Sequence, residues 1–288
     1  MRPDGTRVKD LPPLVAAIPY IMPKRYDAWN SITENIDEEA VKAYIRHWRR
    51  EGVRLKPHEC HHRRLLPGGA GQSKAELLRD ERKKFIGATT SASPSSFSRS
   101  NPNGVVNETA LKVYLEPSDD ISPLTGKFGR LLPPTSMSTS PTAPTSSHGS
   151  CSPCRGCQSS WCGWRIIWTS TGCCPRKIID LSPFHTSMFI TNLASIKTSY
   201  IHHHCYEFGT TSVFVCMGKP VPDYMGGDLT RKVMPIGVVM DERICTGYEY
   251  AAFYSDFKGY LRDLSQLETP FDGSRLQKEE EKTPAGVS

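Results

Sequence analysis

The sequence predicts an α/β fold in which helices cover one face of a β-sheet. Three runs rich in β-branched and aromatic residues, at 185–193, 211–218 and 233–240, are separated by turn residues, which is typical of strands. After Gly247 the apolar residues recur at helical spacing as far as Leu261. Strands followed by a helix on one side indicate a sheet with a helical layer against it.

An amphipathic helix is predicted between Ile36 and Gly52. Asp37 can cap its N-terminus, acidic residues occupy its first turn, and arginines occupy its last turn, where they complement the helix dipole. One face of this helix is apolar and is expected to pack on the core, and it carries Val41, Tyr44, Ile45 and Trp48. Further along the chain, residues 105–115 have the composition of a strand.

Two stretches, 58–100 and 122–174, have a different composition from the rest. The first is rich in Arg, Lys, Ser and Gly, and the second in Ser, Thr, Pro, Cys and Gly. Neither carries enough apolar surface to offset the entropy of ordering, so we expect low-complexity or disordered segments. The charged tail, 272–288, is also expected to be disordered. The remaining parts, 1–57, 101–121 and 175–271, are predicted to form one domain that spans 1–271.

Charge and apolar content exclude two classes of protein. A net charge of +6 over 288 residues, with acidic residues interspersed, does not indicate a nucleic-acid partner. The chain lacks a run of about 18 apolar residues, so we expect no membrane association. No cleavable leader is recognisable at the N-terminus, and we therefore expect a cytoplasmic protein whose 10 cysteines are reduced.

The sequence contains cysteine and histidine clusters, whose side chains are common metal ligands. The cysteines between 151 and 174 match no standard zinc or iron–sulfur spacing and lie in Ser/Pro-rich sequence, namely Cys151, Cys154, Cys157, Cys162, Cys173 and Cys174. We therefore predict no metal site, although metal binding through this cluster is kept as an alternative function. For His202, His203, His204 and Cys205 we expect a loop role, with one of them able to approach a catalytic site.

Codon arithmetic offers one explanation for both unusual stretches. Under the standard genetic code, residues 171–175 read one base earlier can encode His-Gly-Leu-Leu-Pro, and residues 60–64 read one base later can encode apolar residues. The hypothesis is that both stretches are out of frame between compensating shifts. Two genuine disordered inserts are the alternative, and re-sequencing the gene distinguishes the two.

Four blocks resemble one family. They are IPYIMPKR at 18–25, MFITNLASI at 188–196, FGTTSVFVCMGK at 208–219 and VVMDERICTGYEYAAFY at 238–254. Together they are similar to the chloramphenicol acetyltransferase-like proteins, which include the catalytic domains of dihydrolipoamide acyltransferases of 2-oxoacid dehydrogenase complexes. The resemblance implies a two-layer α/β sandwich and a homotrimer with its sites at subunit interfaces. It also implies coenzyme A as a substrate, with no tightly bound cofactor.

The family's His-x-x-x-Asp-Gly motif aligns with a segment in which the key residues are replaced. Glu242 stands at the histidine position and Thr246 at the aspartate position, whereas Arg243 and Gly247 keep their expected types. The resemblance implies that the motif histidine is a general base toward the coenzyme A thiol and that Thr191 stabilises the oxyanion. Glu242 can serve as the base only if burial raises its pKa well above about 4.3.

The resemblance therefore predicts acyl transfer between coenzyme A and a lipoyl-type thiol, if the chain is active. The expected catalytic residues are Glu242, Thr246 and Thr191. No lipoyl domain is recognisable before the first block, so a lipoyl-bearing partner would come from elsewhere. A non-catalytic trimeric scaffold of the same fold, a pseudoenzyme, is the alternative.

Overall fold

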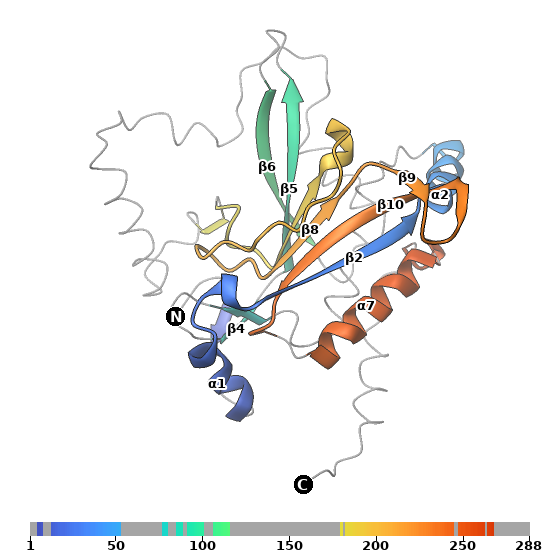
Figure 1. Ribbon diagram of the computed structural model, residues 1–288. Coiled ribbons are helices and arrows are strands. Elements are labelled where there is room, and N and C mark those ends of the chain that lie inside the picture. Colours follow the sequence, from blue (N-terminus) through green and yellow to red (C-terminus); the bar gives the residue numbers. More distant parts are fainter. Residues whose placement is uncertain are drawn as a thin grey trace.

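The computed structural model describes residues 5–7, 13–52, 77–79, 85–88, 91–100, 106–115, 179–180, 182–244, 247–262 and 264–267. These residues form a large mixed sheet, a small antiparallel sheet and a few helices (Figure 1). The strands are β1 (Gly5–Arg7), β2 (Trp29–Asp37), β3 (Leu77–Arg79), β4 (Phe85–Ala88), β5 (Ser91–Ser100), β6 (Val106–Leu115), β7 (Met188–Asn192), β8 (Val213–Met217), β9 (Val221–Asp223) and β10 (Asp228–Asp241). The α-helices are α1 (Pro13–Ile21), α2 (Glu38–Arg50) and α7 (Gly247–Arg262), and the 3-10 helices are η1 (Arg25–Asp27), η3 (Leu193–Ile196) and η4 (Leu264–Leu267).

The large sheet has the order β2-β10-β8-β7-β5-β6, and β9 pairs with the start of β10. Strands β5, β7 and β8 run parallel to one another, whereas β2, β6, β9 and β10 are antiparallel to the strands they pair with. The long strand β10 pairs with β2 along one edge and with β8 along the other. The small sheet has the order β1-β4-β3.

The predicted elements of the C-terminal half are confirmed. The runs at 185–193 and 211–218 contain β7 and β8, and every residue of β8 is buried. The run at 233–240 is the buried part of β10, which begins earlier with the exposed residues 228–232. The helix after Gly247 is α7, and it covers one face of the sheet (Figure 1).

The helix predicted at 36–52 is α2, and its N-terminal cap is as expected. The side chain of Asp37 accepts a hydrogen bond of 2.9 Å from the backbone N–H of Glu39. Val41, Tyr44 and Ile45 are its buried residues. The strand expected at 105–115 is β6.

Several features of the fold, the small sheet among them, were not predicted. The edge strand β2 has alternate residues exposed, because only one of its faces meets the core. The helix α1 contains Pro19, which the sequence indicated as a break in an apolar patch. Strand β5 lies inside the 58–100 stretch, where we expected low complexity, and it joins β6 to β7. The whole of 122–174, the cysteine cluster and both frame-shift boundaries lie outside the described residues.

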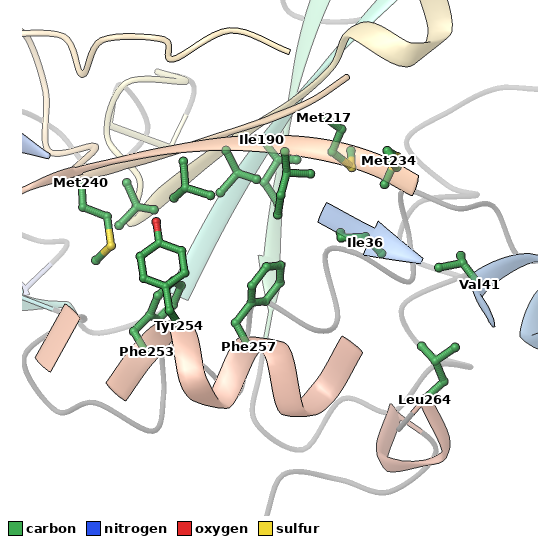
Figure 2. Packing of buried hydrophobic residues seen from close by; sticks show 14 of the residues in the cluster. Ile36, Val41, Ile190, Met217, Met234, Met240, Phe253, Tyr254, Phe257 and Leu264 are labelled. Carbon is green, nitrogen blue, oxygen red and sulfur yellow. The ribbon is translucent and has the colours of Figure 1, made fainter. Parts of the chain in front are cut away.

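The main hydrophobic core lies between the sheet and the helical layer (Figure 2). The Phe253 and Phe257 side chains of α7 point toward the sheet, and both are fully buried. The sheet contributes aliphatic and methionine side chains from four strands, among them Ile36, Ile190, Val215, Met217, Met234, Ile236, Val238 and Met240. The α/β prediction of one helical layer on a sheet is therefore confirmed. Among the described helices, none is long and apolar enough to cross a membrane.

We expect Phe257→Ala to lower the free energy of unfolding by about 3–5 kcal/mol, because it removes a fully buried ring from the interface between α7 and the sheet. Urea denaturation followed by circular dichroism measures the change. Leu229→Ala in the exposed part of β10 is the control, expected to shift stability by no more than about 0.5 kcal/mol. Equal losses in the two variants would show that α7 does not pack as described.

Candidate active site

The segment aligned with the family motif begins at the end of β10. Asp241 pairs with Trp29 at the start of β2, and the backbone N–H of Glu242 donates to the carbonyl of Ala28 over 2.7 Å. A further hydrogen bond of 3.1 Å, from the N–H of Ile244 to the carbonyl of Asp241, closes a turn after β10. Half-buried Glu242 is therefore held at one end of the β2–β10 pair. Thr246, the other predicted motif residue, lies outside the described residues.

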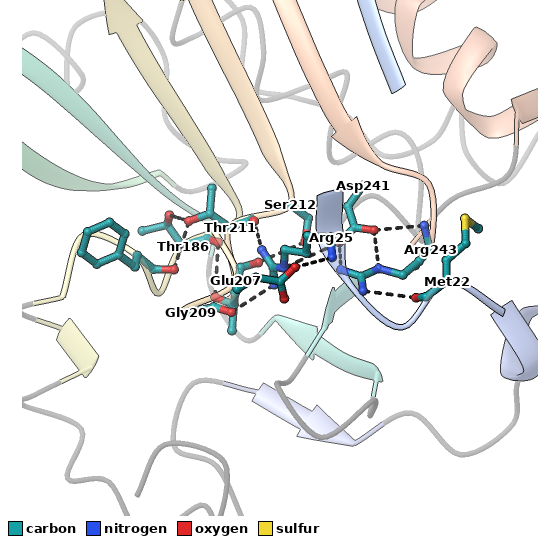
Figure 3. Close-up of polar contacts among 11 residues, drawn as sticks. Met22, Arg25, Thr186, Glu207, Gly209, Thr211, Ser212, Asp241 and Arg243 are labelled. Atoms are coloured by element: carbon teal, nitrogen blue, oxygen red, sulfur yellow. Dashed lines mark hydrogen bonds and ion pairs between the residues drawn. The ribbon is translucent and has the colours of Figure 1, made fainter. Parts of the chain in front are cut away.

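A buried cluster of charges supports this turn (Figure 3). Both oxygens of Asp241 accept hydrogen bonds from Arg243, from Nε over 2.7 Å and from Nη2 over 2.6 Å. The Nε of Arg25 lies 3.7 Å from the same carboxylate, and Nη1 of Arg243 donates to the carbonyl of Met22 over 3.4 Å. All three charged side chains are buried. A buried carboxylate shared by two guanidinium groups is stable only when such hydrogen bonds are made.

The guanidinium of Arg25 also contacts the loop that precedes β8. Its guanidinium donates to the carbonyls of Thr211 and Gly209, the latter over 3.0 Å, and its backbone N–H donates to the Glu207 carboxylate. Gly209 has a φ of +91°, and a Cβ there would collide with the backbone of Phe184. Arg25 therefore connects the N-terminal segment, this loop and the end of β10.

An extended segment crosses the sheet face opposite α7, and we call residues 200–206 the strap. Its backbone approaches Gly237 of β10 so closely that a Cβ there would lie 2.6 Å from the carbonyl oxygen of Ile201. Toward β8, the N–H of Ile201 contacts Sγ of Cys216 at 3.5 Å. Toward β2, the side chains of Tyr200 and His202 both contact Oγ1 of Thr33 at 3.2 Å. The strap therefore covers β10 between its two neighbours.

Of the three strap histidines, His203 faces β8. Its ring stacks on Phe214 with centroids 4.0 Å apart and on His204 with centroids 4.7 Å apart. Its Nδ1 lies 2.8 Å from the carbonyl oxygen of His204, and its Nε2 lies 3.4 Å from the Tyr206 hydroxyl. Burial lowers the pKa of His203 from its ordinary value of 6.5. The neutral imidazole is therefore favoured near neutral pH.

Thr191 lies on the strap face of the sheet. Its neighbour Ile190 belongs to the core on the helical side, whereas Phe189 packs with Phe214 on the strap side, and side chains alternate along a strand. Thr191 pairs with Cys216 of β8, and Cys216 pairs with Gly237 of β10. Glu242 lies five residues beyond Gly237, which is a rise of about 17 Å along the strand direction, so Thr191 and Glu242 are at least that far apart. One chain therefore does not bring these two predicted site residues together.

The two described cysteines are unsuited to nucleophilic chemistry. Burial raises the pKa of Cys205 to about 12, with Arg25 lowering it and Asp241 raising it to smaller extents. Burial also raises the pKa of Cys216. Both thiols are thus protonated near neutral pH. Within the part of the chain that the structure describes, no group of three or more His, Cys, Asp or Glu side chains could hold a metal ion.

Sequence reasoning did not assign roles to Arg25 and Asp241. Both lie inside blocks that carry the family resemblance, which was the available signal, but their contact joins distant parts of the chain. His203 was considered only as one of a loop cluster, because sequence alone does not show which of three adjacent histidines faces the sheet.

The fold is that of acyltransferase catalytic cores. A probable dihydrolipoamide acetyltransferase from Listeria monocytogenes matches with a TM-score of 0.55 and 9% identity, over 93% of this chain and 99% of that chain. The dihydrolipoamide acetyltransferase of Azotobacter vinelandii matches with a TM-score of 0.53 and 10% identity, over 90% and 93%. The cubic core of the pyruvate dehydrogenase multienzyme complex gives the same TM-score of 0.53, also at 10% identity, over 90% of this chain and 93% of that chain.

These similarities confirm the predicted chloramphenicol acetyltransferase-like fold, and at this identity they establish the fold alone. Comparison of the sequence with models of protein families gives no match, and comparison with curated protein sequences gives none either.

We expect Asp241→Asn to destabilise the chain by about 3–5 kcal/mol, because it removes the charge that compensates the buried guanidinium groups of Arg25 and Arg243. Urea denaturation measures the free energy of unfolding. Glu39→Gln, which removes an exposed ion pair with Arg46, is the matched control and is expected to leave stability unchanged. A loss below about 1 kcal/mol for Asp241→Asn would contradict the structural role of the cluster.

Proposed function

We propose that this chain transfers acyl groups between coenzyme A and a lipoyl-type thiol. The observation that carries the proposal is the arrangement of β7, β8 and β10 in a fold shared with dihydrolipoamide acetyltransferases. In this arrangement Thr191 is on the strap face of β7, at the position where the family resemblance implies an oxyanion-stabilising hydroxyl.

The chemistry is thiol-to-thioester exchange. A thiol of pKa about 8.5 loses its proton to a base, and the thiolate attacks the carbonyl carbon of the acyl thioester. The negative charge that develops on the carbonyl oxygen needs a hydrogen-bond donor, and Thr191 is the proposed donor. One such donor contributes about 2.7–4 kcal/mol to transition-state stabilisation. Coenzyme A is a substrate in this scheme and not a resident cofactor.

Oligomerisation bears on the role of Glu242. Within one chain about 17 Å of strand separates it from Thr191, so both can reach one acyl group only if Glu242 comes from a second copy. A homotrimer with sites between subunits, which the resemblance implies, would meet that condition. A folded trimer without turnover would instead support the scaffold alternative.

We expect the purified chain to transfer the acetyl group from acetyl-coenzyme A to dihydrolipoamide, and Thr191→Val to lower kcat by about 10²–10³-fold, because the oxyanion loses its donor. Thr191→Ser should retain most of the activity, since it keeps the hydroxyl. Turnover is measured by thioester formation.

Thr198→Val, at an exposed threonine between η3 and the strap, serves as the control and should behave as the unmodified chain. Undiminished turnover in Thr191→Val would remove this residue from the mechanism. A folded, unmodified chain that shows no turnover with acetyl, propionyl or branched acyl donors would refute acyl transfer.

A further inference from the structure

The missing motif histidine raises the question of which group takes the thiol proton. We propose that His203 of the strap is the general base, an inference that rests on the acyl transfer proposed above. The geometry of the imidazole, its tautomer and its position relative to Thr191 each support this role.

The tautomer of His203 is determined by its hydrogen bonds. Nδ1 lies 2.8 Å from the carbonyl oxygen of His204, and a carbonyl oxygen can only accept, so Nδ1 carries the proton. In the neutral ring Nε2 is then the nitrogen whose lone pair can accept a proton. The Tyr206 hydroxyl lies 3.4 Å from Nε2 and donates to that lone pair, so the reacting thiol has to take the place of this hydroxyl. The hydrogen bond from Nδ1 therefore makes Nε2 the basic nitrogen of His203.

The ring is also held in a fixed orientation. Phe214 stacks on one side of it, with ring planes 9° apart, and His204 stacks with ring planes 22° apart. Phe214 itself stacks on Phe189 of β7, with centroids 4.8 Å apart. A base held by packing loses little entropy when the reacting thiol arrives.

His203 and the proposed oxyanion donor lie on the same face of the sheet. Phe214, which carries the His203 ring, is paired in register with Phe189, and Thr191 lies two residues further along the same strand. Since Phe189 and Thr191 are on the same face of β7, about 7 Å separates their levels along the strand. His203 and Thr191 come from one chain, whereas Glu242 does not approach Thr191 within it.

The neighbouring histidines are less suited to the role. Nε2 of His202 lies 3.2 Å from the carbonyl oxygen of Ile32 and 3.2 Å from Oγ1 of Thr33, so it faces β2, at the far side of β10 from Thr191. His204 is exposed, and its ring meets the edge of Trp29 with centroids 6.1 Å apart. His203 alone among the three stacks on the strand that adjoins β7.

The proton and both C–S bonds are accounted for in the exchange. Nε2 of His203 takes the proton as the thiol S–H bond breaks, and the thiolate forms a new C–S bond to the acyl carbon. The oxyanion accepts a hydrogen bond from Thr191. When it collapses, the original C–S bond breaks, and the departing sulfur takes the proton back from the imidazolium, which restores neutral His203.

The main test compares His203→Phe and His203→Gln in the dihydrolipoamide assay. The Phe variant keeps an aromatic ring stacked on Phe214 and removes the base, so a loss of activity is not attributable to lost packing. We expect kcat to fall by about 10²–10⁴-fold in both variants, with little change in KM. His202→Gln, on the same strap, is the matched control and should keep full turnover.

The pH profile and the tautomer provide two further readouts. The described titratable groups in contact with His203 are His204 and Tyr206. Because burial lowers the pKa of His203 below 6.5, kcat/KM should fall only as the pH drops below 6.5, and this acidic limb should vanish in the variants. Nitrogen-15 NMR of the histidine ring should show the Nδ1–H tautomer without any substrate.

The possible results of these experiments distinguish a failure of the proposed role of His203 from a failure of acyl transfer itself. Full turnover in His203→Phe would overturn the proposal, as would an Nε2–H tautomer in the free protein. Loss of turnover in Glu242→Gln with normal turnover in His203→Phe would assign the base to Glu242 and leave acyl transfer standing. A folded, unmodified chain without any turnover would overturn acyl transfer itself and the role of His203 with it.

Discussion

The buried carboxylate of Asp241 is the interaction on which the site depends. It neutralises Arg25 and Arg243 in surroundings where an uncompensated charge costs several kcal/mol, and it stands at the junction of β2, β10 and the loop before β8. Arg25 extends the network to the carbonyls of Thr211 and Gly209, at the start of the segment that leads into β8. The charge cluster thus aligns β2, β8 and β10 at one end, and hydrophobic packing against α7 completes the fold.

The two faces of the sheet are covered by different parts of the chain. Aliphatic side chains and the rings of Phe253 and Phe257 fill the helical side. On the other side the strap lies so close to Gly237 that a side chain could not be accommodated between them. Because the strap is pressed against the sheet, His203 stacks on Phe214 and lies on the same face as Thr191. A glycine in a buried strand therefore has a direct link to the proposed chemistry.

How much the sequence could predict depended on whether the signal was local. Strand β8 is apolar throughout and α2 begins with a capping aspartate, so both were predicted. Strand β2 was not, because one face is exposed and its place in the sheet comes from pairing with the distant β10. The resemblance proposes Thr191 as a site residue, but no sequence pattern proposes His203. The path of the strap and the tautomer of His203 depend on contacts between distant residues.

The central claim is that one face of the sheet, between His203 and Thr191, receives the reacting thioester. A crystal structure of the chain with bound coenzyme A tests it most directly. We expect the thiol sulfur to lie within hydrogen-bond reach of His203 Nε2, on the strap side of β7 and β8. A sulfur atom placed beside Glu242, with His203 remote from it in every copy, would contradict the claim.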